Sequence, residues 1–203
     1  MVRKSKEDAE KTRQAVLESA LDVFSEKGYA KTTFDEIAAR AGFTKGAVYW
    51  YFRNKADLVA ALIIEYVERK RAEIEKVSPD SLSLDGLLER CCIWAQKSQN
   101  DLRYAKFNKF IFCQMEWSET VLNRVDKNLK ELRAFHLDRI KKILLESRKN
   151  GELKDDVDIE KTQHIIMACY MGIMFSALSK RFDYDAVDMV QTGLRLLIDG
   201  MRK

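Results

Sequence analysis

The sequence has a single proline, Pro79, and only eight glycines among its 203 residues. Few residues therefore interrupt a regular backbone, which favours long amphipathic helices over short strands joined by tight turns. No charge-free run approaches the roughly 20 apolar residues that a membrane span requires. A signal peptide, with its charged start and apolar core, is also missing. We expect a soluble, cytoplasmic, all-α protein that has no membrane partner.

Groups that support catalysis or metal binding are scarce. The two histidines, His136 and His164, stand apart from any serine, cysteine or carboxylate pattern that marks a nucleophile or a metal site. The four cysteines lie in apolar helical patterns and lack the CxxC spacing of zinc and redox sites. They are Cys91, Cys92, Cys113 and Cys169. We therefore expect no enzyme, no metal and no cofactor.

The positive charge is concentrated at the N-terminal end of the chain. The formal net charge of the whole sequence is +4. Residues 1–55 contain eleven Lys/Arg and eight Asp/Glu, so they hold three of these four excess charges. A partner that carries negative charge, such as nucleic acid, is therefore expected to contact this segment.

Local signals in the same segment predict three short helices. The first ends at Gly28, a residue that readily adopts the left-handed backbone of a helix end. The second begins with a capping box, Thr33 with Glu36, and ends at Gly42, and the third begins at Thr44. Two short helices joined by a tight turn are typical of the helix-turn-helix motif, whose second helix enters the major groove of DNA.

The stretch FTKGAVYWYFRNKADL, residues 43–58, has the chemistry of a DNA-contacting helix. Lys45 can reach a base or a phosphate, Gly46 allows the backbone to approach closely, and tyrosine hydroxyls suit phosphate oxygens. We interpret Phe34, Trp50 and Phe52 as structural aromatic residues. The DNA-binding candidates are Thr33, Thr44, Lys45, Gly46, Tyr49, Tyr51 and Lys55.

The segment TTFDEIAARAGFTKGAVYWYFRNKADLVAAL, residues 32–62, closely resembles the DNA-binding segment of TetR-family transcriptional repressors. The resemblance implies a homodimer that binds a palindromic double-stranded DNA operator and releases it when a small lipophilic effector, such as a drug, enters the C-terminal domain. Residues matching Thr44, Lys45, Gly46, Tyr49, Tyr51 and Lys55 commonly lie at the DNA surface in that family. Position 51 is often histidine there, so only a phosphate-contacting role carries over to Tyr51.

We expect a helix-turn-helix DNA-binding domain over residues 1–55 and a helical ligand-binding and dimerisation domain over residues 56–203. The later helices are expected near residues 83–99, 101–117, 119–149, 158–181 and 185–202. Their large, adaptable side chains favour an apolar ligand pocket with a few polar anchors. The ligand-binding candidates are Trp94, Phe107, Phe110, Ile111, Gln114, Met115, Met167, Tyr170 and Met174.

Patterns on the last two expected helices favour contact between subunits. One is a stripe of small side chains that permits close helix packing, formed by Ala168, Gly172 and Ser176. The other repeats at coiled-coil spacing and consists of Val187, Val190, Leu194, Leu197 and Met201. A two-fold dimer built on these helices would suit a palindromic operator. Alternatively, both helices pack only within one subunit.

Two other functions remain open from the sequence. One is an architectural protein that binds DNA without sequence preference, although such a protein would be expected to carry more positive charge. The other is a thiol-based redox regulator that uses Cys91 and Cys92, although neighbouring cysteines on a helix point about 100° apart and bond to each other only with strain.

Overall fold

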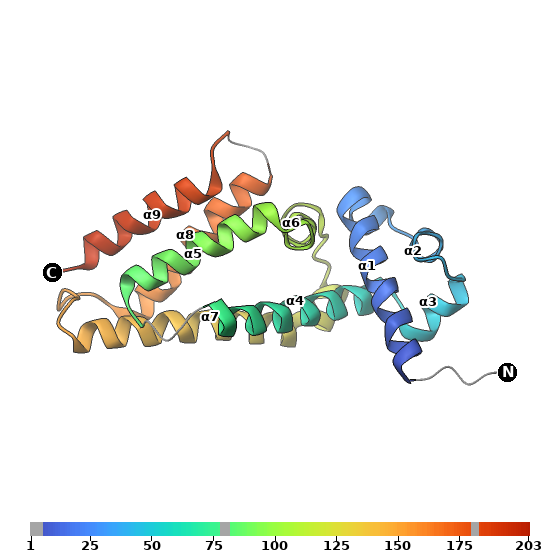
Figure 1. Ribbon diagram of the computed structural model, residues 1–203, viewed down its shortest axis with the longest axis horizontal. Coiled ribbons are helices and arrows are strands. Elements are labelled where there is room, and N and C mark those ends of the chain that lie inside the picture. Colours follow the sequence, from blue (N-terminus) through green and yellow to red (C-terminus); the bar gives the residue numbers. More distant parts are fainter. Residues whose placement is uncertain (1–5, 78–81, 180–182) are drawn as a thin grey trace. The chain divides into compact units, whose positions relative to one another are not determined.

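The computed structural model describes residues 6–77, 82–179 and 183–203. Within these ranges the ordered elements are helical apart from one isolated β-bridge between Leu153 and Arg202, which confirms the all-α prediction. The predicted loop at Pro79 and the end of the helix expected at residue 181 lie outside them. The elements are α1 (Lys6–Lys31), α2 (Phe34–Ala41), α3 (Lys45–Tyr51), α4 (Lys55–Val77), α5 (Leu84–Asn100), α6 (Leu102–Lys109), η1 (Phe110–Gln114), α7 (Glu119–Lys149), α8 (Ile159–Leu178) and α9 (Ala186–Met201) (Figure 1).

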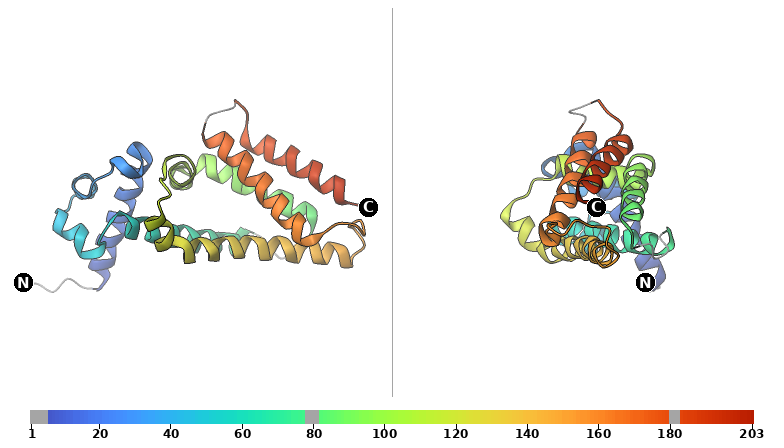
Figure 2. Two further views of the ribbon diagram at one scale, coloured as in Figure 1. Left: turned by 180° about the vertical axis from the view of Figure 1, so that it is seen from behind. Right: turned by 90° about the vertical axis from the view of Figure 1, so that its left-hand side faces the viewer.

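The helices pack into two compact units. Unit 1 comprises the chain up to Arg69 together with Lys106–Leu129, and unit 2 comprises Lys70–Ala105 and Lys130–Lys203. Figure 2 shows α1, α2 and α3 grouped in the first unit and α5, α8 and α9 grouped in the second. Helices α4 and α7 contribute residues to both units. The units defined by packing therefore differ from the domains expected from the sequence, which meet at residue 55.

Helix α1 provides much of the core of unit 1. Val16, Leu17 and Phe24 are fully buried on it. The ring of Phe24 stacks on that of Phe110 with centroids 4.7 Å apart, and Asp22 accepts a hydrogen bond from the ammonium group of Lys106 at 2.6 Å. These contacts attach α6 and η1 to α1. The helical backbone of α1 is interrupted at Gly28, as predicted.

The helix expected over residues 101–117 is shorter in the structure. It starts where expected, because the carboxylate of Asp101 accepts a hydrogen bond from the backbone N–H of Arg103 at 2.9 Å. After Lys109 the chain forms the π-helical turn η1 and then becomes extended at Met115. A π-helical turn changes the hydrogen-bond register of the helix. Here it coincides with the burial of Phe110 against α1.

The local signals for α2 and α3 are confirmed. Thr33 and Glu36 form the predicted capping box, and Thr44 is the N-cap of α3. Gly42 ends α2 in the left-handed conformation, with φ 72°, and its N–H points to the carbonyls of Ala38 and Ala39. The short α3 is held against the unit by Val48, which is fully buried.

Replacing Gly42 by alanine is expected to lower the free energy of unfolding by about 1–2 kcal/mol, because an L-residue is disfavoured in the left-handed region. An added Cβ would meet no heavy atom within 4 Å, so this cost arises from the backbone alone. Urea unfolding measures the difference. Gly46→Ala is the matched control, because Gly46 lies in a helix and alanine is favoured there. Equal stability of the Gly42→Ala and wild-type proteins would contradict the expectation.

Unit 2 is built around the packing of α9 against α5 and α8. Its core includes Leu84, Leu144 and Ile166, which are all buried. The hydroxyl of Tyr184 donates to the backbone carbonyl of Ile173 at 3.0 Å, which links the start of α9 to α8. At the other end, the N–H of Lys203 donates to the carbonyl of Glu152 at 2.9 Å. Both ends of α9 are therefore fixed within unit 2.

Candidate DNA-binding surface and effector region

Helix α3 presents two of the predicted DNA-binding side chains to solvent. The side chain of Lys45 is 49% exposed and Tyr49 is 50% exposed. The ring of Tyr49 also packs on that of Phe34 from α2, with centroids 4.7 Å apart. Because the buried Val48 fixes α3 on the unit, the exposed Lys45 and Tyr49 project from a fixed helix, as readout of a DNA groove requires.

Lys45 forms an ion pair that sequence reasoning missed. Its ammonium group donates to the carboxylate of Asp35 at 2.7 Å, and this hydrogen bond raises the pKa of Lys45. Both side chains are exposed, and exposed ion pairs contribute little to stability. Lys45 therefore remains charged and can exchange the carboxylate for a phosphate or a base edge at low cost.

Two threonines and a glycine shape the ends of these helices. The hydroxyl oxygen of Thr33 accepts a hydrogen bond from the N–H of Glu36 at 3.3 Å, and that of Thr44 accepts one from the N–H of Ala47 at 3.2 Å. Both threonines are exposed as well as capping. Gly46 is exposed, and a Cβ placed there would meet only the hydroxyl of Thr44, at 3.9 Å. The first turn of α3 is therefore open to close approach.

Lys55 and Tyr51 are less accessible than the sequence predicted. The ammonium group of Lys55 donates to the carbonyl oxygens of Tyr29 at 2.7 Å and Ala30 at 3.0 Å, and burial lowers the pKa of Lys55. A lysine has three N–H donors, so at most one is left for a phosphate. Tyr51 is half-buried beside Phe52. Lys55 thus also connects the end of α1 to the start of α4.

The structural role predicted for Trp50 is wrong. Its side chain is 83% exposed, whereas Phe34 and Phe52 are buried as predicted. The helical spacing contains the signal that was missed, because residues two apart on a helix lie about 200° apart. Since Val48 faces the core, Trp50 must face away from it. Trp50 therefore joins the exposed side chains of α3 that are available to DNA.

The predicted ligand-binding residues fall in both units. Phe107 and Phe110 are buried in unit 1, where Phe107 stacks on Tyr66 with centroids 4.0 Å apart. Ile111, Gln114 and Met115 follow in the same unit and are half-buried. Unit 2 contains Trp94, Met167, Tyr170 and Met174, of which only Met174 is fully covered. Phe110 belongs to the core through its stacking on Phe24.

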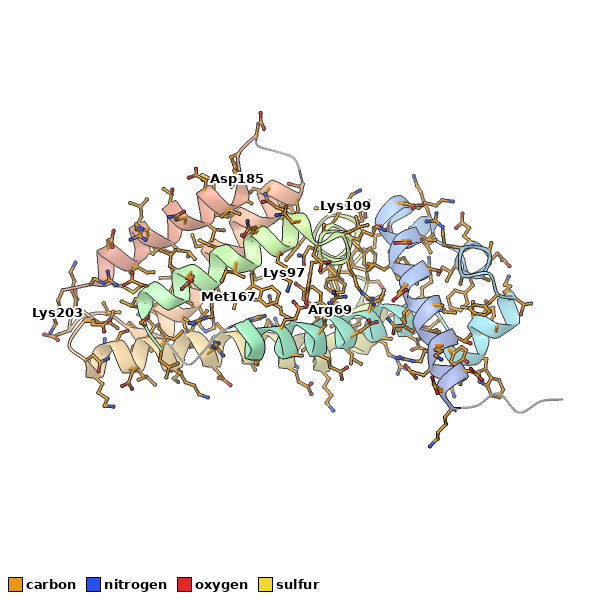
Figure 3. The ribbon with its side chains drawn as sticks, viewed as in Figure 1. Arg69, Lys97, Lys109, Met167, Asp185 and Lys203 are labelled. Carbon is orange, nitrogen blue, oxygen red and sulfur yellow. The ribbon has the colours of Figure 1, made fainter. Side chains whose placement is uncertain are left out.

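Charged side chains surround Trp94 in unit 2, and sequence reasoning did not select them. The ammonium groups of Lys70 and Lys97 lie 4.9 Å and 5.4 Å from the centroid of the Trp94 ring. Lys97 extends from α5 toward α4 and forms an ion pair with Glu73 (Figure 3). Tyr104 meets Trp94 edge to face, with centroids 5.6 Å apart. Lys70 was missed because it lies in the charged run ERKRAEIEK, which reads as a solvated helix end.

The predicted subunit contacts require a correction on α9. Val190, Leu194 and Met201 are buried within unit 2, so their side chains have little surface left for a partner. Val187 and Leu197 are half-buried and pack against the same core. The coiled-coil spacing therefore reflects packing inside one chain. The other face of α9 is exposed and includes Met189, Leu196 and Gly200.

The small-residue stripe on α8 lies at the surface. Ala168 and Gly172 are exposed and Ser176 is half-buried. Two larger apolar residues on the same side of α8, Ile165 and Met171, are 52% and 42% exposed. We use the name α8/α9 face for these exposed residues of α8 together with Leu196 of α9, which is 71% exposed. Large exposed apolar side chains on two helices that pack together make this face a candidate for protein interaction.

The two adjacent thiols do not have the properties of a redox switch. Removal from water raises the pKa of the Cys91 thiol to about 12, and it also raises the pKa of Cys92. The thiolate is the reactive form of cysteine, so both shifts oppose oxidation at neutral pH. The structure thus gives no support to the redox alternative.

We expect iodoacetamide at pH 8 to alkylate the exposed Cys113 and to leave Cys91 unmodified in the folded protein. A pKa of about 12 reduces the thiolate population of Cys91 about a thousandfold relative to a thiol with an ordinary pKa. Peptide mass spectrometry after timed labelling measures the two rates, with the urea-unfolded protein as the control. Equal labelling of Cys91 and Cys113 in the folded protein would revive the redox alternative.

Comparisons with known proteins agree with the helix-turn-helix geometry. Residues 16–62 match the family model for bacterial regulatory proteins of the tetR family. The chain is 28% identical to the probable HTH-type transcriptional regulator ArpR of Pseudomonas putida, covering 97% of this chain and 96% of that protein. It is 29% identical to the HTH-type transcriptional regulator AcrR of Shigella flexneri, covering 98% and 93%. The structure of a SmeT–triclosan complex superposes with TM-score 0.79 and 26% identity, covering 95% of this chain and 92% of that one.

The chain has a capped helix-turn-helix, and its second helix exposes basic and aromatic side chains. It also has a second helical unit. These features together define an all-helical DNA-binding regulator with two units. The match over residues 16–62 and the similarity over nearly the full chain to HTH-type transcriptional regulators support a TetR-family regulator. In the residues that the structure describes, no helix is both long and apolar enough to cross a membrane.

Proposed function

We propose that this chain is a cytoplasmic repressor that binds a palindromic operator as a homodimer and releases it when a small lipophilic effector binds. The exposed face of α3, with Lys45, Tyr49 and Trp50 fixed on a capped helix, is the observation that carries this proposal. Residues 1–55 form the DNA-binding domain, and residues 56–203 form the effector-binding and dimerisation domain. The SmeT–triclosan complex, at 26% identity, supports an effector of lipophilic character.

The α8/α9 face is the proposed dimer interface. Ala168 and Gly172 allow a partner helix to approach closely, while Ile165, Met171 and Leu196 supply apolar area. A two-fold dimer formed through this face would carry two α3 helices. On B-DNA such helices must be separated by about 34–36 Å, or by a multiple of that distance, to occupy successive major grooves.

Helix α4 is the proposed mechanical connection between effector and DNA. Its first residue, Lys55, donates to the backbone carbonyls at the end of α1, and its later residues Lys70 and Glu73 contact side chains near Trp94. An effector that binds better to one position of α4 would shift the population toward that position. Release of the operator follows if the recognition helices then no longer match the groove spacing.

Selection from genomic DNA tests this function. The purified protein is incubated with a pool of genomic fragments over a series of salt concentrations, and the bound fragments are sequenced. A regulator of the proposed kind recovers a shared inverted repeat that survives moderate salt, because base contacts add to the salt-dependent phosphate contacts. Binding that is uniform across fragments and disappears with salt would instead indicate a sequence-independent DNA binder.

A further inference from the structure

Two lysines share one aromatic ring in unit 2. The ammonium groups of Lys70 and Lys97 lie 4.9 Å and 5.4 Å from the ring centroid of Trp94, within the range of cation–π contact. Lys97 also lies 5.8 Å from the ring centroid of Tyr104, which is buried. Lys70 and Trp94 are half-buried. Two cations therefore converge on an aromatic surface that is partly withdrawn from water.

Further charged side chains lie near these lysines. Glu73 forms an ion pair with Lys97. Cys91 lies within electrostatic reach of both Lys70 and Arg90, and the pKa of Arg90 is lowered by burial and by the charge of Arg139. Burial likewise lowers the pKa of Lys70 to about 8. Withdrawing several like charges from water is unfavourable, and such arrangements gather where a function uses them.

We propose that Lys70, Lys97 and the ring of Trp94 form a subsite for the negatively charged end of the effector, a carboxylate on a lipophilic body. Each ammonium group has three N–H donors, so a carboxylate placed at both could accept charge-assisted hydrogen bonds from them. Met167 and Tyr170 of α8, half-buried in the same unit, supply the apolar and adaptable surface that the lipophilic body needs. This assignment deepens the effector-binding function proposed above and rests on it.

Three probes with the same alkyl chain and different head groups test the charge preference. Laurate is anionic, lauryl alcohol is neutral and dodecyltrimethylammonium is cationic. Isothermal titration of the full-length protein without DNA, below micelle-forming concentrations, gives each affinity. We expect laurate to bind at least about tenfold more tightly than the alcohol, since a charged hydrogen bond is worth more than one factor of ten. The cation is expected to bind most weakly.

Substitutions identify the residues responsible. Lys70→Met keeps much of the length of the side chain and removes its charge, so laurate affinity should fall about tenfold while alcohol affinity is unchanged. Lys97→Met should act in the same direction, and Lys70→Arg should preserve the preference for laurate. Lys149→Met is the matched control, because Lys149 is on α7 with a largely exposed side chain, and it should change none of the affinities.

Several results would overturn the subsite. In the first, the wild type binds laurate and lauryl alcohol with equal affinity. In the second, dodecyltrimethylammonium binds as tightly as laurate. In the third, the Lys70→Met protein loses affinity for all three probes alike. Fluorescence anisotropy with the inverted repeat recovered from genomic DNA distinguishes failure of the subsite from failure of the proposed function. If laurate binds in a manner that depends on Lys70 but the operator stays bound, the result supports the subsite and contradicts effector-driven release. Release by the alcohol or the cation alone supports effector-driven release and contradicts the subsite.

Discussion

Replacing Lys45 by alanine is expected to weaken operator binding about 10- to 100-fold, while the protein remains folded and keeps its oligomeric state. A good side-chain contact to a base edge contributes about 1–3 kcal/mol to discrimination, and Lys45 is the exposed basic residue at the start of α3. The loss in stability should be small, because Lys45 pairs with Asp35 at the surface. Fluorescence anisotropy with the selected operator measures the affinity, and urea unfolding checks the fold.

Two further variants make this experiment specific. Asp35→Ala breaks the same ion pair but leaves the cation, so it should retain or improve operator affinity, since a carboxylate close to phosphates is repelled. Tyr49→Phe removes only the hydroxyl from a ring that stays packed on Phe34, and it should weaken binding less than Lys45→Ala does. If the Lys45→Ala and Tyr49→Phe proteins both bind the operator with wild-type affinity, α3 is not the helix that recognises the operator.

Replacing Gly172 by arginine is expected to convert the protein into a folded monomer and to lower operator affinity by at least about a thousandfold, toward the level of nonspecific binding. Gly172 is exposed and a Cβ added there would meet no heavy atom within 4 Å, so we expect the subunit to fold with the new side chain in solvent. It would, however, prevent close approach of a partner helix at the centre of the α8/α9 face. Sedimentation velocity measures the assembly, and anisotropy measures the affinity for operator.

The control for Gly172→Arg is Ala134→Arg on α7, which adds the same bulk and charge at another exposed helical position. It should leave both the dimer and the operator affinity unchanged. Circular dichroism and thermal unfolding establish that both variants fold. A Gly172→Arg protein that remains a dimer would place the interface elsewhere and remove the α8/α9 face from the account.

Sequence reasoning succeeded where a signal is local. The break at Gly28, the capping box of Thr33 and Glu36, and the glycine stop at Gly42 each depend on a few neighbouring backbone groups. Their combination predicted the helix-turn-helix. The exposure of Lys45 and Tyr49 followed from it, because a helix of only seven residues with one buried position leaves few alternatives for the exposed face, while their contact with DNA stays a prediction.

Sequence reasoning failed where a side chain has two possible neighbours. Val190 and Leu194 on α9 have the spacing expected for contact with a helix of a partner subunit. In the structure they are buried in unit 2, where α9 packs against α5 and α8 of the same chain. Periodicity shows that a face is covered without showing what covers it. Lys70 failed for a similar reason, because a lysine in a charged run reads as solvated until the fold places it over Trp94.

The most direct test of the central claim is the affinity and stoichiometry of the wild-type protein on the selected inverted repeat, compared with a single half-site and with scrambled DNA of equal length. The account predicts an even number of chains per inverted repeat, with affinity at least about a thousandfold above that for scrambled DNA at physiological salt. Binding to the half-site should be much weaker, because only one recognition helix can engage it. Equal affinity for all three DNAs, or one chain per inverted repeat, would contradict a dimeric, operator-specific regulator.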